Sequence, residues 1–274
     1  MTTATLKSPL IMLKKIAVLL VSLLFFCNAD AAHPLITDDT GTQGKGKFQI
    51  EINSAFSTDK SSEGGISTKT RASEMAAALS FGMTDTIDLV LGIPWQSYTI
   101  TEENMPKMNE QGFCDMSIEI KWRLFDPEEN GLSLALKPRL SIPSGSEEKG
   151  LGNGAISEGL TAIATHKGKL GALHANLGYT HQEYRMEENI NAAQNNIWHA
   201  SLAGELNLTE KLRSVVNIGM ETNKEKASDT NPAFLLAGLI YSAYENFDLD
   251  VGVKAGLNKS ETDTILLAGL AARF

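Results

Sequence analysis

The stretch Asp115–Leu124, DMSIEIKWRL, alternates polar and apolar side chains over its whole length. A period of two is typical of a β-strand whose two faces meet different surroundings. One face carries Lys121 and Arg123, whereas the other carries methionine, isoleucine, tryptophan and leucine. This stretch therefore predicts a strand with one charged face and one fully apolar face.

The same alternation recurs from residue 47 to the last residue. It is clear in 47–56, 115–124, 132–142, 173–179, 198–208, 212–220, 247–257 and 264–274. It is weaker in segments that are rich in alanine, glycine or leucine, namely 71–81, 86–95, 154–166 and 232–243. The sequence thus predicts twelve strands and an all-β fold.

Short and long connections alternate between these strands. Short turns are expected near 84–85, 126–131, 167–169, 209–211 and 245–246, and polar loops at 57–69, 101–113, 145–153, 182–196, 222–231 and 258–263. Every long loop then lies at one end of an up-and-down sheet. Such an asymmetry, with an even strand number, indicates a 12-stranded antiparallel up-and-down transmembrane β-barrel of the outer-membrane type, formed by residues 47–274.

The cost of burying charge in lipid decides which strand face points outward. Lys121 or Lys137 would each cost roughly 2–4 kcal/mol near the middle of a bilayer, so the charged face is expected to line the interior. Closure of the barrel would pair every strand edge. Pro94 and Pro138 each remove a backbone donor, so we expect a strand end or a bulge at each.

Composition sets a further limit on partners. The chain has 274 residues, is 42% hydrophobic and carries a formal net charge of −9. An acidic balance disfavours the phosphate contacts of nucleic-acid binding, so no nucleic-acid partner is expected.

The N-terminus has the features of a secretory signal. Two lysines precede an apolar run at 16–27, and an Ala-Asp-Ala cleavage pattern ends at Ala31. Residues 1–31 are therefore expected to be removed, with Met12 as an alternative start. An uncleaved membrane anchor is the less favoured alternative, because the run is short. Residues 32–46, which include most of HPLITDDTGTQGKGK (33–47), are expected to form a periplasmic N-terminal segment. An alternative is that this segment folds into the mouth of the barrel.

Two single residues carry further expectations. Cys114 is the only cysteine after residue 31, so no intrachain disulfide is possible, and its thiol is expected to be buried or lipid-facing. Phe274 ends an alternating strand and resembles the C-terminal signal that bacterial barrel-assembly machinery reads. The predicted destination is the cell outer membrane.

Several motifs follow one another over nearly the whole mature chain. They are HPLITDDTGTQGKGKFQIE at 33–51, GMTDTIDL at 82–89, IPW at 93–95, GFCDMSIEIKWR at 112–123, IPSG at 142–145 and KGLGNG at 149–154. In this order they resemble a bacterial family described as the MetA-pathway of phenol degradation or transporter family. The resemblance implies an outer-membrane β-barrel that passes or binds small, aromatic or hydrophobic molecules. Cys114 and Ser144 depart mildly from the pattern.

Charged side chains predicted to face the lumen are the candidate site. They are Glu51, Glu74, Asp88, Glu119, Lys121, Arg123, Lys137 and Arg139, and the same alternation also places Arg71 and Glu158 inside. The four basic residues would form a ladder on two adjacent strands, opposite acidic residues of the first three strands. Opposed charges across a water-filled pore would set ion preference. The alternative is that these charges pair and close a narrow lumen.

Motifs for metal or catalytic chemistry are weak. The five histidines lack metal-ligand spacing, DDTG at 38–41 lacks the later ligands of a calcium loop, and 41–46 lacks the phosphate-binding loop pattern. No cofactor, metal or enzymatic activity is expected. An outer-membrane lipid hydrolase is a minor alternative, disfavoured because His174 and His199 are predicted to point inward.

The sequence therefore predicts a passive channel or transporter for small solutes, with a closed structural or scaffold barrel as the alternative. The expected partners are outer-membrane lipids and lipopolysaccharide, the barrel-assembly machinery and a small-molecule solute. Because the predicted long loops hold more acidic than basic residues, divalent cations could bridge them to lipopolysaccharide phosphates.

Overall fold

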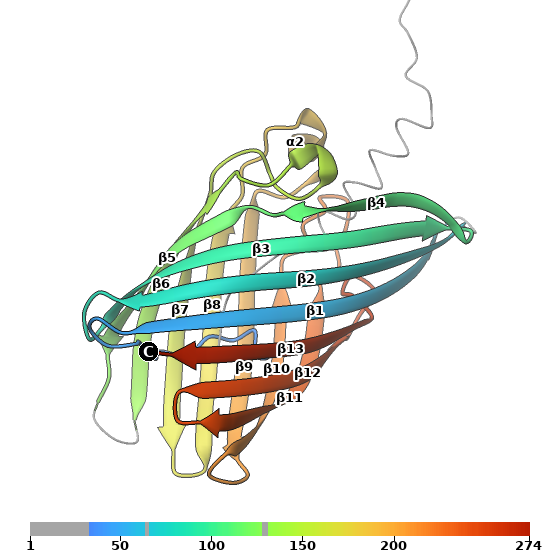
Figure 1. Ribbon diagram of the computed structural model, residues 1–274. Helices are drawn as coiled ribbons and strands as arrows, with labels where there is room; N and C mark the ends of the chain where they lie inside the picture. Colours follow the sequence, from blue (N-terminus) through green and yellow to red (C-terminus); the bar gives the residue numbers. More distant parts are fainter. Residues whose placement is uncertain (1–32, 64–65, 128–130) are drawn as a thin grey trace, which may run out of the picture.

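Twelve antiparallel strands close into a barrel, and a further strand extends one side of it (Figure 1). The computed structural model describes residues 33–63, 66–127 and 131–274, so the predicted signal peptide lies outside the described residues. The strands are β1 Phe48–Glu63, β2 Ile66–Gly82, β3 Ile87–Glu102, β4 Met105–Phe113, β5 Met116–Phe125, β6 Leu132–Ile142, β7 Ser157–Gly168, β8 Gly171–His181, β9 Asn196–Asn207, β10 Leu212–Glu221, β11 Ala233–Tyr244, β12 Phe247–Gly256 and β13 Thr264–Arg273. A 3-10 helix, η1 Glu147–Lys149, and a short helix, α2 Glu187–Ala192, lie in loops.

Closure joins the first and last strands of the barrel. β1 pairs with β13 along most of its length, and the backbones of Phe48 and Phe274 exchange hydrogen bonds of 2.9 and 3.1 Å at the end of this seam. The remaining neighbours follow chain order, except that β5 lies beside β3. The predicted twelve-stranded antiparallel barrel is confirmed.

The strand that pairs with β3 changes part-way along its length. The first part of β3 pairs with β5, and the later part, from Trp95 to Glu102, pairs with β4. Pro94 lies at this change, and its carbonyl oxygen accepts from the N–H of Cys114 (2.9 Å). The strand end or bulge expected at Pro94 is absent from β3 itself, which runs through Pro94 and keeps its register with β2; only the neighbour on its other side changes there. Pro138 likewise lies inside β6, where it pairs with Leu160 of β7.

The loops predicted at 57–69 and 101–113 are wrong. Both are hairpins in which β1, β2, β3 and β4 continue beyond the neighbouring strands (Figure 1). Residues 57–69 and 101–113 are mostly polar, and apolar residues do not alternate with polar ones in them. Strand pairing depends on the backbone, so it continues here although the side chains show no period of two.

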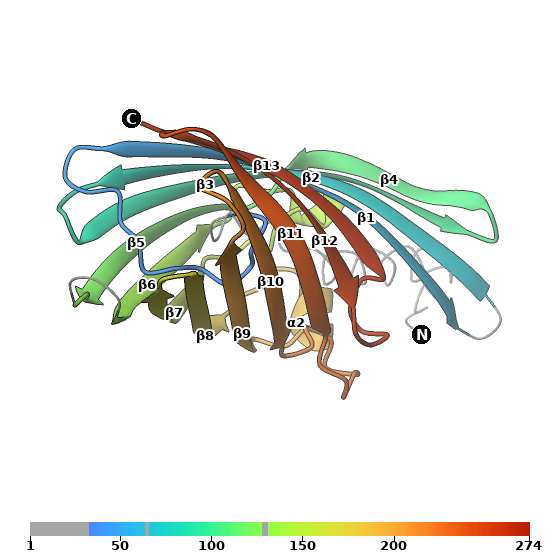
Figure 2. The same ribbon diagram turned by 90° about the horizontal axis from the view of Figure 1, so that it is seen from below.

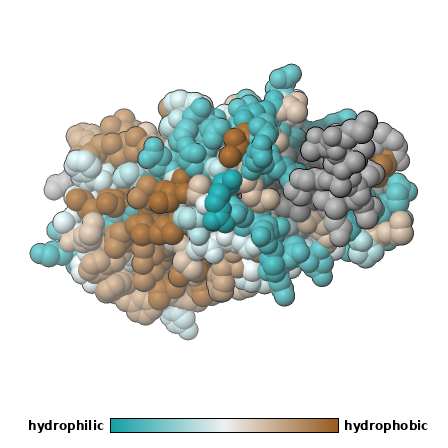
Figure 3. Space-filling view, turned by 90° about the horizontal axis from the view of Figure 1, so that it is seen from above, coloured by the Kyte–Doolittle hydropathy of each residue, from teal (hydrophilic) through white to brown (hydrophobic). Residues whose placement is uncertain are grey.

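Side chains alternate between a buried inner face and an exposed apolar outer face. On β5, Ile120 is 41% and Trp122 is 48% exposed, whereas Glu119, directly before Ile120, is 1% exposed. The side chain of Lys121, between Ile120 and Trp122, is 12% exposed. Figure 3 views the molecule from the α2 side and shows apolar side chains gathered over part of the surface, apart from the hydrophilic ones. No helix among the described residues is long and apolar enough to cross a membrane.

Candidate functional site

Residues 33–46 do not join the sheet but run inside the ring of strands (Figure 2). This segment, called the plug below, enters beside the short turns, where Gly46 donates a backbone hydrogen bond to Gly82 (2.7 Å). Farther along, the N–H of Gln43 donates to both carboxylate oxygens of Asp88 (3.0 and 3.2 Å). The plug therefore reaches from the barrel mouth on the side of the short turns into the barrel interior.

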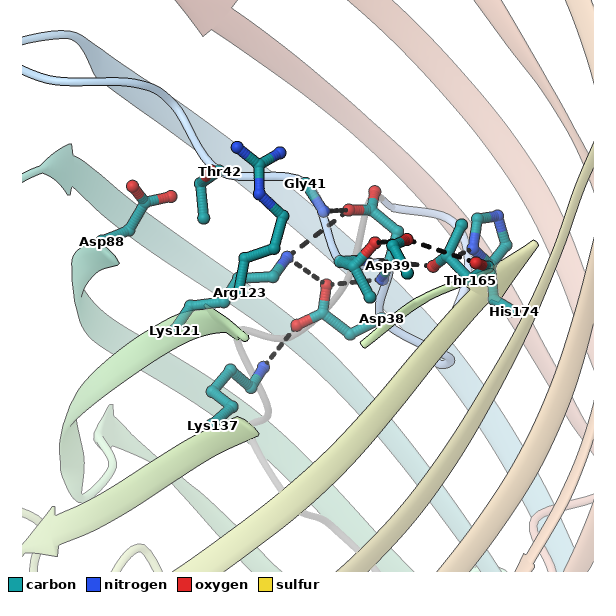
Figure 4. Close-up of polar contacts among 12 residues, drawn as sticks. Asp38, Asp39, Gly41, Thr42, Asp88, Lys121, Arg123, Lys137, Thr165 and His174 are labelled. Carbon is teal, nitrogen blue, oxygen red and sulfur yellow. Dashed lines mark hydrogen bonds and ion pairs between the residues drawn. The ribbon is translucent and has the colours of Figure 1, made fainter. Parts of the chain in front are cut away.

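An ion-pair network holds the middle of the plug (Figure 4). The Asp38 carboxylate lies 2.9 Å from Lys121 Nζ and 2.8 Å from Lys137 Nζ, and its side chain is only 8% exposed. Lys121 also lies 3.5 Å from Asp39, and Lys137 lies 3.4 Å from Glu119. Buried charges need partners, because an unpaired one costs several kcal/mol. These pairs therefore fasten the plug to β5 and β6.

Neutral hydrogen bonds fasten other parts of the plug to β10 and β7. Asn217 of β10 accepts from the backbone N–H groups of Ile36 (2.8 Å) and Thr37 (3.0 Å), and its amide donates to Thr37 Oγ1 (2.7 Å). On β7, Thr165 Oγ1 accepts from the N–H of Thr40 (3.1 Å). A segment outside a sheet must find partners for its backbone, and here barrel side chains supply them.

Small residues make room for the plug on β11 and β12. A Cβ atom at Gly238 would lie 2.6 Å from Pro34 Cγ, and one at Gly252 would lie 2.9 Å from Pro34 Cβ. Leu35, 2% exposed, packs in a buried apolar cluster that includes Val215. Pro34 thus fits a surface formed by two glycines, and Leu35 packs against apolar side chains of the barrel interior.

The plug lies between two cavities. A cavity of about 380 Å³ lies on the side of the long loops, and one of about 520 Å³ lies on the side of the short turns. We call them the loop-side and turn-side chambers. His33 and Asp38 line both chambers, so the plug is their common wall.

The structure brings seven of the eight predicted lumen charges to these chambers. Glu51, Asp88, Glu119 and Lys121 line the turn-side chamber, Glu74 and Arg139 line the loop-side chamber, and Lys137 lines both. Arg123 lies instead at the end of the barrel that carries the short turns, 3.1 Å from Asp126. Their part in permeation stays a prediction.

The partners of the basic ladder differ from those that the sequence predicts. Lys121 and Lys137 pair with Asp38 of the plug, and Arg139 Nε lies 3.5 Å from Glu119. Sequence reasoning missed Asp38 because it precedes the first strand. One signal was available. The sequence places two aspartates, Asp38 and Asp39, before strands whose inner face carries the four basic residues of the ladder.

Among residues 33–63, 66–127 and 131–274, no three or more His, Cys, Asp or Glu side chains are grouped so that they could hold a metal ion. Cys114 is buried and forms no disulfide bond with another described residue. The part of the chain that the structure describes therefore offers a polar, ion-paired interior and two cavities as its candidate site.

Comparison with known proteins adds the family. The profile of the family described as "Putative MetA-pathway of phenol degradation" matches residues 34–274. This chain belongs to that family.

Solved structures agree with the fold of this family member. The COG4313 outer membrane channel from Pseudomonas putida F1 is similar at a TM-score of 0.66 and 13% identity, covering 86% of this chain and 98% of its own. The NanC porin is similar at 0.53 and 9% identity, covering 81% and 98%. A comparison with curated proteins finds no match. The protein is an outer-membrane β-barrel.

The family motifs meet at the break between β4 and β5. Asp115, in GFCD, accepts hydrogen bonds from the backbone N–H of Gly145 (2.9 Å) and of Asn153 (2.8 Å), which lie in IPSG and KGLGNG. A Cβ atom at Gly145 would lie 2.1 Å from the carbonyl oxygen of Leu151, so only glycine fits there. The loop 143–154 is thereby clamped against the loop-side chamber.

Proposed function

We propose that this protein is an outer-membrane channel for small solutes with an aromatic or other apolar part, and that its own N-terminal segment controls the passage. The observation that carries the proposal is the plug between two chambers. Each chamber is polar or charged on one side, and the plug is held between them by side-chain contacts. Movement of a short segment would join the chambers without breaking a strand pair.

The interior wall of β9–β11 supports solutes with an apolar body. Ile197 and Phe234 line the loop-side chamber, Ile240 lines the turn-side chamber, and each is at most 5% exposed. A sugar or an ion would gain no binding energy from such a wall, whereas contact with it would stabilise an apolar ring or chain. The similarity to the COG4313 outer membrane channel supports the channel class.

A closed scaffold barrel is the second candidate function. The network around Asp38 favours it, because paired buried charges resist displacement.

Uptake decides between the two candidates. Bacterial cells that lack general porins would be given radiolabelled benzyl alcohol or a sugar, with and without this protein.

A channel of the proposed kind accelerates initial uptake of the aromatic solute more than that of the sugar. A scaffold barrel accelerates neither, and that result would overturn the proposal. Cells that express the Asp126→Asn variant, which keeps Asp38, serve as the control. They should take up both solutes as cells with the unaltered protein do, because Asp126 lies at an exposed turn.

A further inference from the structure

The loop-side chamber contains two polar side chains that no plug contact explains. Glu74 on β2 and Gln96 on β3 are direct partners in the register of these strands, and both line the chamber. Gln96 is 2% exposed, and its Nε2 has no hydrogen-bond partner among the residues that the structure describes. Its Oε1 faces the thiol of Cys114, with Sγ 3.9 Å away. A buried amide donor without a partner thus lies in the wall of the chamber.

The Glu74 carboxylate next to it is available as an acceptor. With the described residues it makes no hydrogen bond and no ion pair, although Lys254 and Lys224 attract it through space. These two lysines have closer partners of their own. Lys254 Nζ lies 3.0 Å from Glu261, and Lys224 Nζ lies 3.0 Å from Glu221. Burial lowers the pKa of Lys224, and the attraction of Glu221 opposes this.

Apolar side chains flank this polar pair along one row of the sheet. The strand register runs from Leu267 through Ala55 to Glu74 and Gln96. Leu267 and Ala55 also line the chamber. A ligand that reaches both polar groups therefore lies with the rest of its body beside small and apolar side chains.

We propose that Glu74 and Gln96 form a binding site for small apolar molecules that carry a hydroxyl group. The inference rests on the proposed function and names its solute class. A hydroxyl group is both donor and acceptor, so it donates to the Glu74 carboxylate and accepts from Gln96 Nε2. The chamber, at about 380 Å³, lies near the lower end of ligand-pocket volumes and so selects small molecules.

Other ligand classes satisfy this pair less well. A hydrocarbon leaves the buried Gln96 donor unpaired, a carboxylate is repelled by Glu74, and an amine leaves Gln96 without an acceptor. Sites built to bond a hydroxyl reject analogues that lack it, because their own polar groups then stay unsatisfied. The site therefore discriminates an alcohol from the matching hydrocarbon.

The test compares benzyl alcohol, toluene and benzoate on the full chain in lipid nanodiscs. Binding is measured by saturation-transfer NMR titration, with empty nanodiscs as the background. We expect benzyl alcohol to bind about tenfold more tightly than either analogue, and Gln96→Met to remove this preference. Gln49→Met, which removes the same amide from the turn-side chamber, should leave it unchanged.

A swap of the two residues separates chemistry from folding. Gln96→Glu alone removes the donor and should abolish the preference for the alcohol. The double variant Glu74→Gln with Gln96→Glu restores one donor and one acceptor and should recover it. Equal binding of benzyl alcohol and toluene by the unaltered chain, or no recovery in the double variant, would overturn the site. Faster aromatic uptake by cells would still stand in that case, whereas absence of uptake would overturn the channel itself.

Discussion

Asp38 is the residue on which the plug depends most. Its carboxylate bridges Lys121 and Lys137, whose side chains are 12% and 6% exposed. Two ammonium groups so close together would repel each other without the aspartate between them. The cost of removing one partner of such a buried pair is typically several kcal/mol.

Replacement of Asp38 by Asn should therefore lower the free energy of unfolding by about 3 kcal/mol and free the plug for part of the time. Thermal unfolding in detergent, followed by circular dichroism, measures the first effect. Asp126→Asn is the control, because its ion pair with Arg123 is more exposed and should contribute at most about 1 kcal/mol. Equal melting temperatures for the two variants would show that Asp38 does not anchor the plug.

Gly252 tests the contact with Pro34. A methyl group there would lie 2.9 Å from Pro34 Cβ and 3.4 Å from the nearest backbone oxygen, so its main conflict is with the plug. Gly252→Ala should destabilise the protein by about 1–3 kcal/mol, and the effect should vanish in a chain that lacks residues 33–46. Gly204→Ala is the matched control, because its Cβ would meet only Leu173 at an ordinary 3.5 Å. Persistence of the effect without the plug would contradict this account.

At the scale of elements, the loop 143–154 depends on one carboxylate. Asp115→Ala should raise hydrogen exchange at the N–H groups of Gly145 and Asn153, since both donate to that side chain. Asp115→Asn keeps one acceptor oxygen and should give an intermediate rate. Glu148→Ala, an exposed change in the same loop, serves as the control. Unchanged exchange in Asp115→Ala would mean that other contacts hold the loop.

The strands that cross the membrane could be predicted from the sequence, because lipid and lumen impose opposite demands on alternate residues. The two long hairpins could not, since their mostly polar sequences carry no period of two although their backbones pair. The same loss of contrast misplaced two charges. Arg71 and Glu158 are exposed and lie on the outward-facing set of β2 and β7, although the sequence predicts them inside.

At the scale of the whole molecule, the barrel and the plug followed from different kinds of information. Alternation fixes the faces of a strand, but no periodicity describes a segment held by side chains of β5, β7 and β10. Seven of the eight predicted charges line the chambers because parity decides their direction. The ion-pair partners of these charges could not be predicted from the alternation of side chains, because Asp38 lies outside every strand.

The central claim is that the plug blocks a path that the barrel otherwise provides. Single-channel conductance in planar bilayers tests it most directly, with the unaltered protein and a refolded chain that lacks residues 33–46. Removal of the plug joins the chambers of about 380 and 520 Å³, so we predict a larger and steadier conductance for the shortened chain. Equal conductance from both chains, or no current from either, would contradict the account.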